Sequence, residues 1–149
     1  MTTQSLQQTS APARQSRIRG FGAAMVLALL GQLLLGMANT FWLDVPETGS
    51  AWNVAQPAAL VTAHMTVGTA LVVLACWIGW IAIRTRDRAW LVVSAIGIAG
   101  IVLGFVGGTA FMGDPSNDVV SFVMAVGCTV ALGAYALGLY RLPRGETSV

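Results

Sequence analysis

Three polar side chains, Gln32, Asn39 and His64, lie within long apolar stretches of this chain. Polar groups in a bilayer are costly to bury, and they usually face other helices or a functional site. The imidazole of His64, the only histidine, would suit an axial bond to haem iron, proton transfer or a hydrogen bond between helices. We favour a hydrogen bond from His64 to Asn39 or to a backbone carbonyl. Gln32 is expected to link helices in the same way.

A haem site would need a second axial ligand beside His64. Counting 1.5 Å per helical residue places Met37 and Met124 about 6 and 8 Å from one membrane boundary, and His64 about 9 Å from it. These three residues are therefore the candidate cofactor-binding set. Haem bundles in membranes usually supply at least two histidines, whereas this chain has one. We therefore expect no cofactor, with haem as the alternative.

Other motifs of catalysis are missing from the sequence. The apolar stretches contain no carboxylate, and the chain has no HExxH, CxxC or phosphate-binding loop. We expect no catalytic residue and no metal site, and a proton-coupled exporter of the small multidrug-resistance type is disfavoured because it needs an intramembrane acid. Cys76 and Cys128 would differ in depth by roughly 13 Å, which is too far for a disulfide.

Four apolar stretches must position these side chains. They run over residues 21–41, 58–83, 90–111 and 119–140, and each reaches the ~20 residues that cross a bilayer as a helix. Hydrophobic residues make up 56% of the 149 residues and charged residues only 9%, against about 25% charged in soluble domains. The sequence thus predicts an all-α polytopic membrane protein, a four-transmembrane-helix bundle surrounded by lipid.

The arginines predict the orientation. All eight basic residues are arginine, and they lie before the first stretch, between the second and third, or after the fourth. The other two connections hold four acidic residues and no basic residue. The positive-inside rule then places both termini in the cytoplasm of a bacterium, with the chain in its plasma membrane. A net charge of +2 gives no support for nucleic-acid binding.

The two ends of the chain are polar. We expect residues 1–20 to be a disordered cytoplasmic tail, residues 21–141 the membrane domain, and residues 142–149 a cytoplasmic C-terminal tail. A second interpretation is that the first helix is a signal peptide cleaved near the triplet Gly36-Met37-Ala38. Gln32 and the length of the apolar run favour a retained helix.

Aromatic residues and loop residues mark the helix ends. Trp77, Trp80, Trp90 and Tyr140 are expected to form an aromatic belt at the arginine side. The connection around residues 42–57 is the longest, and it is expected to fold onto the membrane surface or over the bundle mouth. In the tight turn near residue 115, Asp118 is expected to cap the last helix.

Small residues at four-residue intervals predict how the helices pack. The third stretch contains two overlapping GxxxG motifs, and the fourth contains small residues at the same spacing. Such stripes allow close backbone approach in a membrane. We expect the two stripes to face each other within one chain; the alternative is a homodimer through the glycines. The residues are Gly100, Gly104 and Gly108 facing Ser121, Ala125, Thr129 and Gly133.

Four segments of the sequence resemble a group of small membrane proteins. They are GMANTFWLDVP, AHMTVGTALVVLA, GTAFM and AVGCTVALGAYALGLY, and they resemble small four-helix membrane proteins of high-GC Gram-positive bacteria that have no assigned activity. The similarity covers about 120 residues, everything after the N-terminal tail. A more distant likeness is to one four-helix half of haem A synthase, through His64 followed four residues later by Gly68. That family uses paired histidines, so the likeness implies only a candidate ligand at His64.

Together these features predict a non-enzymatic accessory or assembly subunit of a membrane complex, whose partner is another membrane protein or a second copy. One alternative is a haem-binding or redox membrane protein built on His64. A weaker alternative is a small transporter or channel with an uncharged path along Gln32, Asn39, Thr62, Thr66 and Thr69.

Overall fold

The computed structural model describes residues 10–42, 50, 52, 59–115 and 117–141, with side chains from Ile18 onward. These residues form four helices, and no strand occurs among them. All four helices are long and apolar enough to cross a membrane. The expected all-α four-helix bundle of a multi-pass membrane protein is therefore confirmed. The helices are α2 (Ser10–Trp42), α3 (Ala59–Thr85), α4 (Arg88–Gly113) and α5 (Asp118–Arg141).

Helix α2 begins earlier than the sequence indicated. It starts at Ser10, so the expectation of a disordered tail through residue 20 is wrong from Ser10 onward, and residues 1–9 lie outside the described part. Pro12 falls in the first turn, where its missing N–H costs no helical bond. The alanines, arginines and glutamine that follow it are good helix formers. Helix α2 also supplies Met25 and Leu29 to the core, contacts that cleavage near Ala38 would remove.

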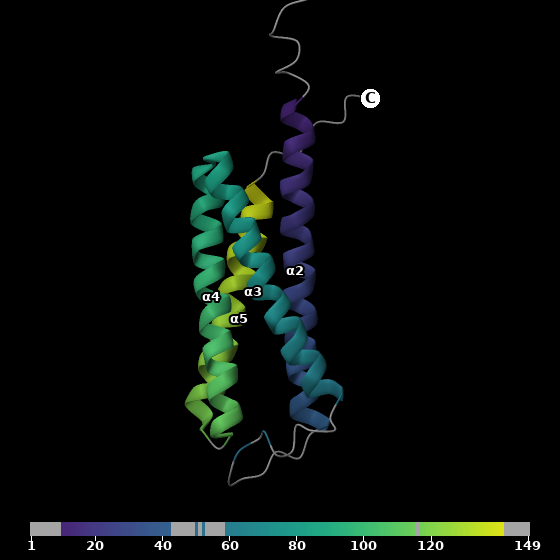
Figure 1. The fold of residues 1–149 in the computed structure, drawn as a ribbon, viewed down its shortest axis with the longest axis vertical. Coiled ribbons are helices and arrows are strands. Elements are labelled where there is room, and N and C mark those ends of the chain that lie inside the picture. Colours follow the sequence, from purple (N-terminus) through teal and green to yellow (C-terminus); the bar gives the residue numbers. More distant parts are fainter. Residues whose placement is uncertain (1–9, 43–49, 51, 53–58, 116, 142–149) are drawn as a thin grey trace, which may run out of the picture.

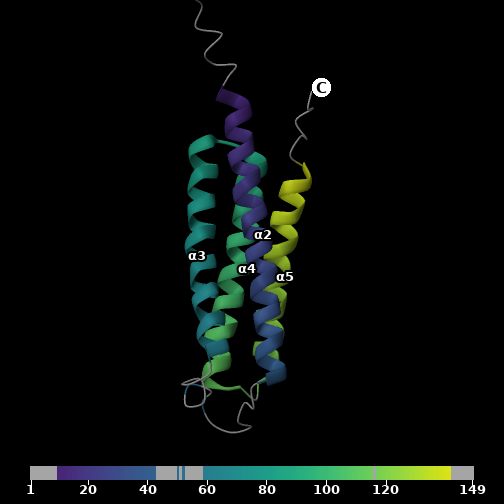
Figure 2. The same ribbon diagram turned by 90° about the vertical axis from the view of Figure 1, so that its right-hand side faces the viewer.

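The helices alternate in direction and form a ring in which each packs on two neighbours. Helix α2 lies against α3 and α5, and α4 lies against the same two helices, while the described backbones of the diagonal pairs make no close contact. Figures 1 and 2 show this up-and-down arrangement. In Figure 1, α3 runs obliquely, so that it lies beside α4 near the arginine end and beside α2 near the opposite end.

The core follows a three-and-four residue spacing along α2 and α3. The buried hydrophobic positions on α3 are 71, 75, 78 and 82, and those on α2 are 25 and 29. This is the seven-residue repeat of helices that pack at a shallow angle. The cluster extends to α4 and α5 through Trp90, Ile101, Ala131 and Tyr135.

Helices α4 and α5 make the closest contact in the bundle, through glycine. A methyl group added at Gly127 would lie 2.5 Å from the Gly104 nitrogen and 2.6 Å from the Gly100 carbonyl oxygen. Gly108 meets α5 as well, at the Met124 sulfur. The predicted glycine motif on α4 therefore does face α5 within one chain. Within the chain, α5 covers Gly100 and lies against Gly104.

The predicted stripe on α5, however, is wrong. Ala125, Thr129 and Gly133 are exposed, and a methyl group added at Gly133 would have no atom within 4 Å; Ser121 is half-buried. The face that packs on α4 is centred on Gly127 and mixes small with large side chains, and each of the pairs below places an α5 residue over a glycine of α4. The pairs are Tyr135 at Gly97, Ala131 at Gly100, and Met124 at Gly107.

Trp90 closes the bundle at the arginine end. It is 4% exposed, and its ring lies against Gly22 of α2 and Gly138 of α5, 2.9 and 3.6 Å from where their methyl groups would be. The prediction that Trp90 belongs to an aromatic belt at the membrane surface is therefore wrong. Trp80 and Tyr140, which were predicted to lie in the same belt, are exposed. Two glycines on other helices create the space that makes burial possible.

Both short connections are held by side-chain caps. Asp87 accepts hydrogen bonds from the Ala89 and Trp90 nitrogens at 3.1 and 3.2 Å and so begins α4. At the other end, Asn117 accepts from the Val119 nitrogen at 3.1 Å. The cap of α5 is therefore Asn117 and not Asp118, because α5 already includes Asp118 as its first residue.

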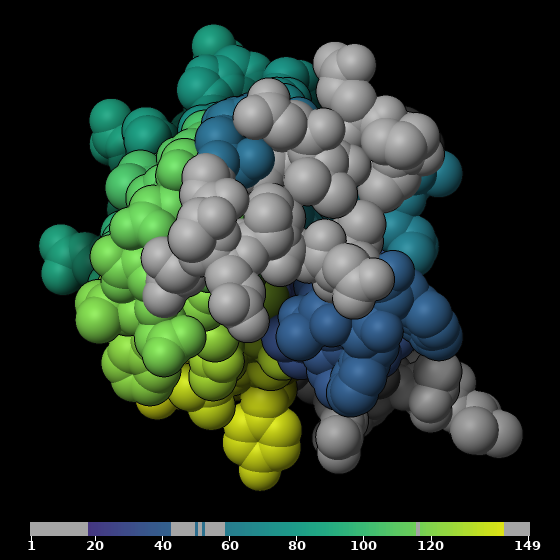
Figure 3. Space-filling view, turned by 90° about the horizontal axis from the view of Figure 1, so that it is seen from below, coloured from purple at the N-terminus to yellow at the C-terminus, as the bar shows by residue number. Residues whose placement is uncertain are grey.

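The connection between α2 and α3 reaches across to α4. The Ser50 hydroxyl donates to the Met112 carbonyl oxygen at 3.0 Å, and the neighbouring Trp52 is 47% exposed. Figure 3 looks onto this end, where α2 lies on one side of the surface and the ends of α4 and α5 lie on the other. Of the loop residues expected to cover the mouth, Leu43, Val45 and Val54 lie outside the described residues.

Candidate functional site

The polar side chains at depth meet at the contact between α2 and α3. The Gln32 Nε2 and the His64 Nε2 are 3.1 Å apart and form a hydrogen bond. Since an amide nitrogen can only donate, the His64 Nε2 accepts, and its proton then lies on Nδ1. The predicted link between helices through His64 is present. The partner, however, is Gln32 and not Asn39 or a backbone carbonyl.

Two glycines make room for this pair. Gly36 on α2 faces the imidazole, and a methyl group there would lie 3.3 Å from the His64 Cε1. Gly68 on α3 faces the amide, and a methyl group there would lie 3.1 Å from the Gln32 Nε2. Each polar side chain therefore lies over a glycine of the opposite helix. We call Gln32, Gly36, His64 and Gly68 the polar clasp.

Three polar atoms in and beside the clasp make no hydrogen bond. Gln32 Oε1, His64 Nδ1 and Asn39 Oδ1 are buried atoms without a partner in the described structure. Gln32 and Asn39 are two helical turns apart on α2, on the same face as Gly36. In a bilayer an unpartnered polar atom is costly, so the clasp can still accept a hydrogen bond at Gln32 and donate one at His64.

The two candidate methionines do not complete a site with His64. Met37 is 51% exposed, since it is one residue past Gly36 and so turned about 100° away from the contact with α3. Met124 packs against Gly107 and Gly108 of α4. The His64 Nε2 already bonds Gln32. These residues therefore do not fit a haem held between His64 and either methionine.

The threonines on α3 face outward. Thr62, Thr66 and Thr69 are exposed, and the last two donate to carbonyl oxygens one turn earlier, at 2.7 and 2.9 Å. This is the common way for a hydroxyl on a membrane helix to satisfy itself. Their arrangement therefore gives no support to an uncharged path through the bundle.

A second pair of buried polar groups was missed by sequence reasoning. Ser94 on α4 is 2% exposed and Tyr135 on α5 is fully buried, and neither hydroxyl has a partner in the described structure. The Tyr135 ring occupies the hollow at Gly97. The available signal was depth: Tyr135 lies six residues inside the end of α5, too deep for a headgroup belt, and Gly97 stands on the adjacent helix.

Metal binding has no support in the described ranges, where no three His, Cys, Asp or Glu side chains gather as a metal site would require. Both cysteines are free, as their predicted depths required. The chain matches no family model, no curated protein and no solved structure.

Proposed function

We propose that this chain is a non-enzymatic accessory or assembly subunit of a larger membrane complex, located in a bacterial plasma membrane with both termini in the cytoplasm. The orientation rests on the one-sided arginines. The resemblance to small four-helix proteins of high-GC Gram-positive bacteria supports the compartment. A subunit of this kind acts by the contacts of its outer surface, and its interior serves to hold its shape.

The observation that carries this proposal is that the polar clasp joins two helices of this chain to each other. The His64 Nε2, the atom that would ligate iron or receive a proton, instead bonds Gln32 and joins α2 to α3. Gly36 and Gly68 are fitted to the two side chains. A side chain engaged in this way stabilises a helix pair, and a contact of this type in a membrane contributes about 0.6 kcal/mol on average.

Photo-cross-linking tests for a partner. A photoreactive amino acid is placed, one at a time, at an exposed position on each of the four helices. The positions are Leu34, Val73, Val106 and Leu137, which are 65, 67, 56 and 58% exposed. An accessory subunit should give a discrete protein adduct from one or two helix faces in cells. The control is the same variant reconstituted alone in lipid, where the adduct should disappear. Lipid adducts at all four positions would contradict the proposal, and an adduct of twice the mass that persists in the control would indicate a homodimer.

A redox role remains the second candidate because the His64 Nδ1 is buried without a partner. An absorption spectrum of the protein purified without added haem separates the two. We expect no Soret band. A strong band that disappears in His64→Gln would replace the accessory proposal with the redox one, because glutamine keeps a donor and an acceptor but cannot form the axial bond.

A further inference from the structure

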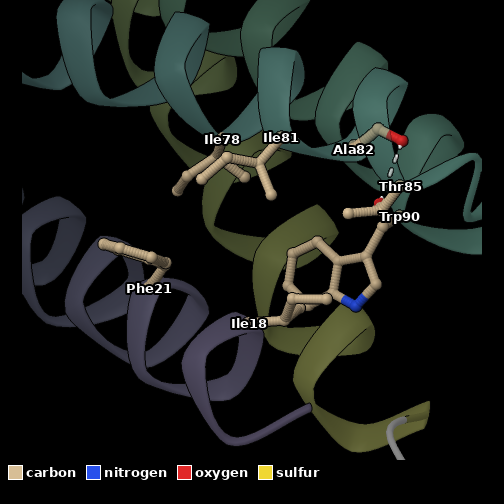
Figure 4. A pocket seen from close by; sticks show the side chains of 7 residues that line it. All are labelled: Ile18, Phe21, Ile78, Ile81, Ala82, Thr85 and Trp90. Carbon is tan, nitrogen blue, oxygen red and sulfur yellow. Dashed lines mark hydrogen bonds between the residues drawn. The ribbon is translucent and has the colours of Figure 1, made fainter. Parts of the chain in front are cut away.

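An apolar cleft opens between α2 and α3 at the arginine end of the bundle. Ile78, Ala82 and Trp90 form its floor, and each is less than 5% exposed. Phe21 stands at the mouth with 37% of its surface exposed. Figure 4 shows α2 and α3 side chains facing each other across the cleft, with Trp90 beside them. The remaining lining residues are Ile18, Ile81 and Thr85.

The lining is almost wholly apolar, and its side chains carry two polar groups, the Thr85 hydroxyl and the indole nitrogen of Trp90. Thr85 is its one residue with a hydroxyl, and that hydroxyl donates to the Ala82 carbonyl oxygen at 3.2 Å. The free volume is about 10 Å³, whereas small-molecule sites occupy roughly 300 Å³ or more. A space so shallow and apolar fits the side of a hydrocarbon chain and excludes a headgroup or a flat ring.

Positive charge gathers at the end of the bundle where the cleft opens. Arg19 follows Ile18, Arg86 follows Thr85, and Arg88 lies two residues before Trp90, so α2, the α3–α4 connection and α4 each carry an arginine close in sequence to a lining residue. The segments that flank this end carry eight arginines against Asp87 and Glu146, a formal charge of +6. The Asp87 carboxylate is engaged as the α4 cap. Basic clusters beside transmembrane helices attract anionic headgroups.

We propose that this cleft binds an anionic phospholipid, with one side of an acyl chain against its lining and the phosphate at the arginines in and beside the α3–α4 connection. The floor residues bury hydrocarbon, and the charge selects the headgroup. Arg86 is suited to the second role because it directly follows Thr85 of the lining, its backbone adopts a positive φ of 53° as α3 ends, and its side chain is exposed.

Native mass spectrometry of the full-length protein tests the proposal. Phosphatidylglycerol and phosphatidylcholine with identical acyl chains are offered at equal concentration. We expect one phosphatidylglycerol to be retained preferentially on the wild type. Equal retention of the two lipids would overturn the proposal without reference to any variant. An excess of inorganic phosphate should leave the lipid bound, because phosphate lacks the acyl chain; displacement by phosphate would refute the role of the cleft.

Matched variants locate the site. Arg86→Gln should weaken the preference for phosphatidylglycerol about fivefold, the value of one basic residue near an anionic surface, whereas Arg86→Lys should keep it. Ile81→Trp fills the cleft and should remove the retained lipid. Ile83→Trp is the control, since Ile83 lies on the same helix and is 65% exposed. Equal loss in Ile81→Trp and Ile83→Trp would place the lipid elsewhere.

Discussion

The glycine contact between α4 and α5 allows a prediction in which one substitution has opposite effects at two positions of the same helix. Gly127 and Gly133 are both on α5. A methyl group at Gly127 would lie 2.5 Å from the Gly104 nitrogen and 2.6 Å from the Gly100 oxygen, whereas at Gly133 it would meet no atom within 4 Å. Replacement by alanine should therefore push the two helices apart at the first position and leave their packing unchanged at the second.

The magnitude follows from what must move. Ordinary non-bonded contacts lie near 3.5 Å, so both backbone atoms must retreat by roughly 1 Å, and neither is the end of a flexible side chain. Overpacking of this kind costs about 1–3 kcal/mol. Gly133→Ala gains helix propensity, worth up to about 1 kcal/mol. Gly127→Ala gains the same propensity, so the two variants should differ in free energy of unfolding by the overpacking cost alone, roughly 1–3 kcal/mol.

Unfolding in mixed micelles, followed by tryptophan fluorescence and by circular dichroism, measures this difference. Gly133→Ala is the matched control, because both variants make the same change in backbone entropy. We expect Gly127→Ala to unfold first and Gly133→Ala to unfold with or after the wild type. Equal stabilities of the two variants, or a loss confined to Gly133→Ala, would show that α5 packs through its other face and would refute the glycine contact.

The remaining predictions concern the clasp, the orientation and a cap. His64→Leu should lower the free energy of unfolding by about 0.6–1.7 kcal/mol, the average and the maximum measured for one interhelical hydrogen bond in a membrane; a loss several times larger in the same unfolding assay would point to a bound cofactor. A cysteine at Ser50 should react with an impermeant thiol reagent on intact cells and one at Arg86 should not, and the reverse result would invert the topology. Asp87→Ala should cost about 0.5–2 kcal/mol by removing the α4 cap, which thermal unfolding in detergent measures, and an unchanged midpoint would contradict that assignment.

The depth of each polar residue in the membrane could be predicted from the sequence, whereas the residue that it contacts on another helix could not. Gln32, Asn39 and His64 could be placed at depth by counting along the helices, but the partner of His64 depends on how α2 slides along α3. The hollows at Gly36 and Gly68 decide it, since they admit His64 and Gln32 and so pair them at 3.1 Å. Trp90 shows the same limit, because its burial depends on Gly22 and Gly138, which lie on helices far away in sequence.

The sequence by itself determined that the chain forms four membrane-length helices and that its arginines gather at one end. Both follow from local composition, since a backbone in hydrocarbon must satisfy its own hydrogen bonds and therefore becomes helical wherever about 20 apolar residues run together. Only the tertiary structure decided which face of each helix is buried. In α5, small residues lie on both the exposed and the buried face, since Gly133 is exposed and Gly127 is buried, and hydropathy does not separate the two faces. The second face is buried because Gly127 allows close backbone approach and Met124, Ala131 and Tyr135 lie over glycines of α4. Shape complementarity between two helices is a property of the pair.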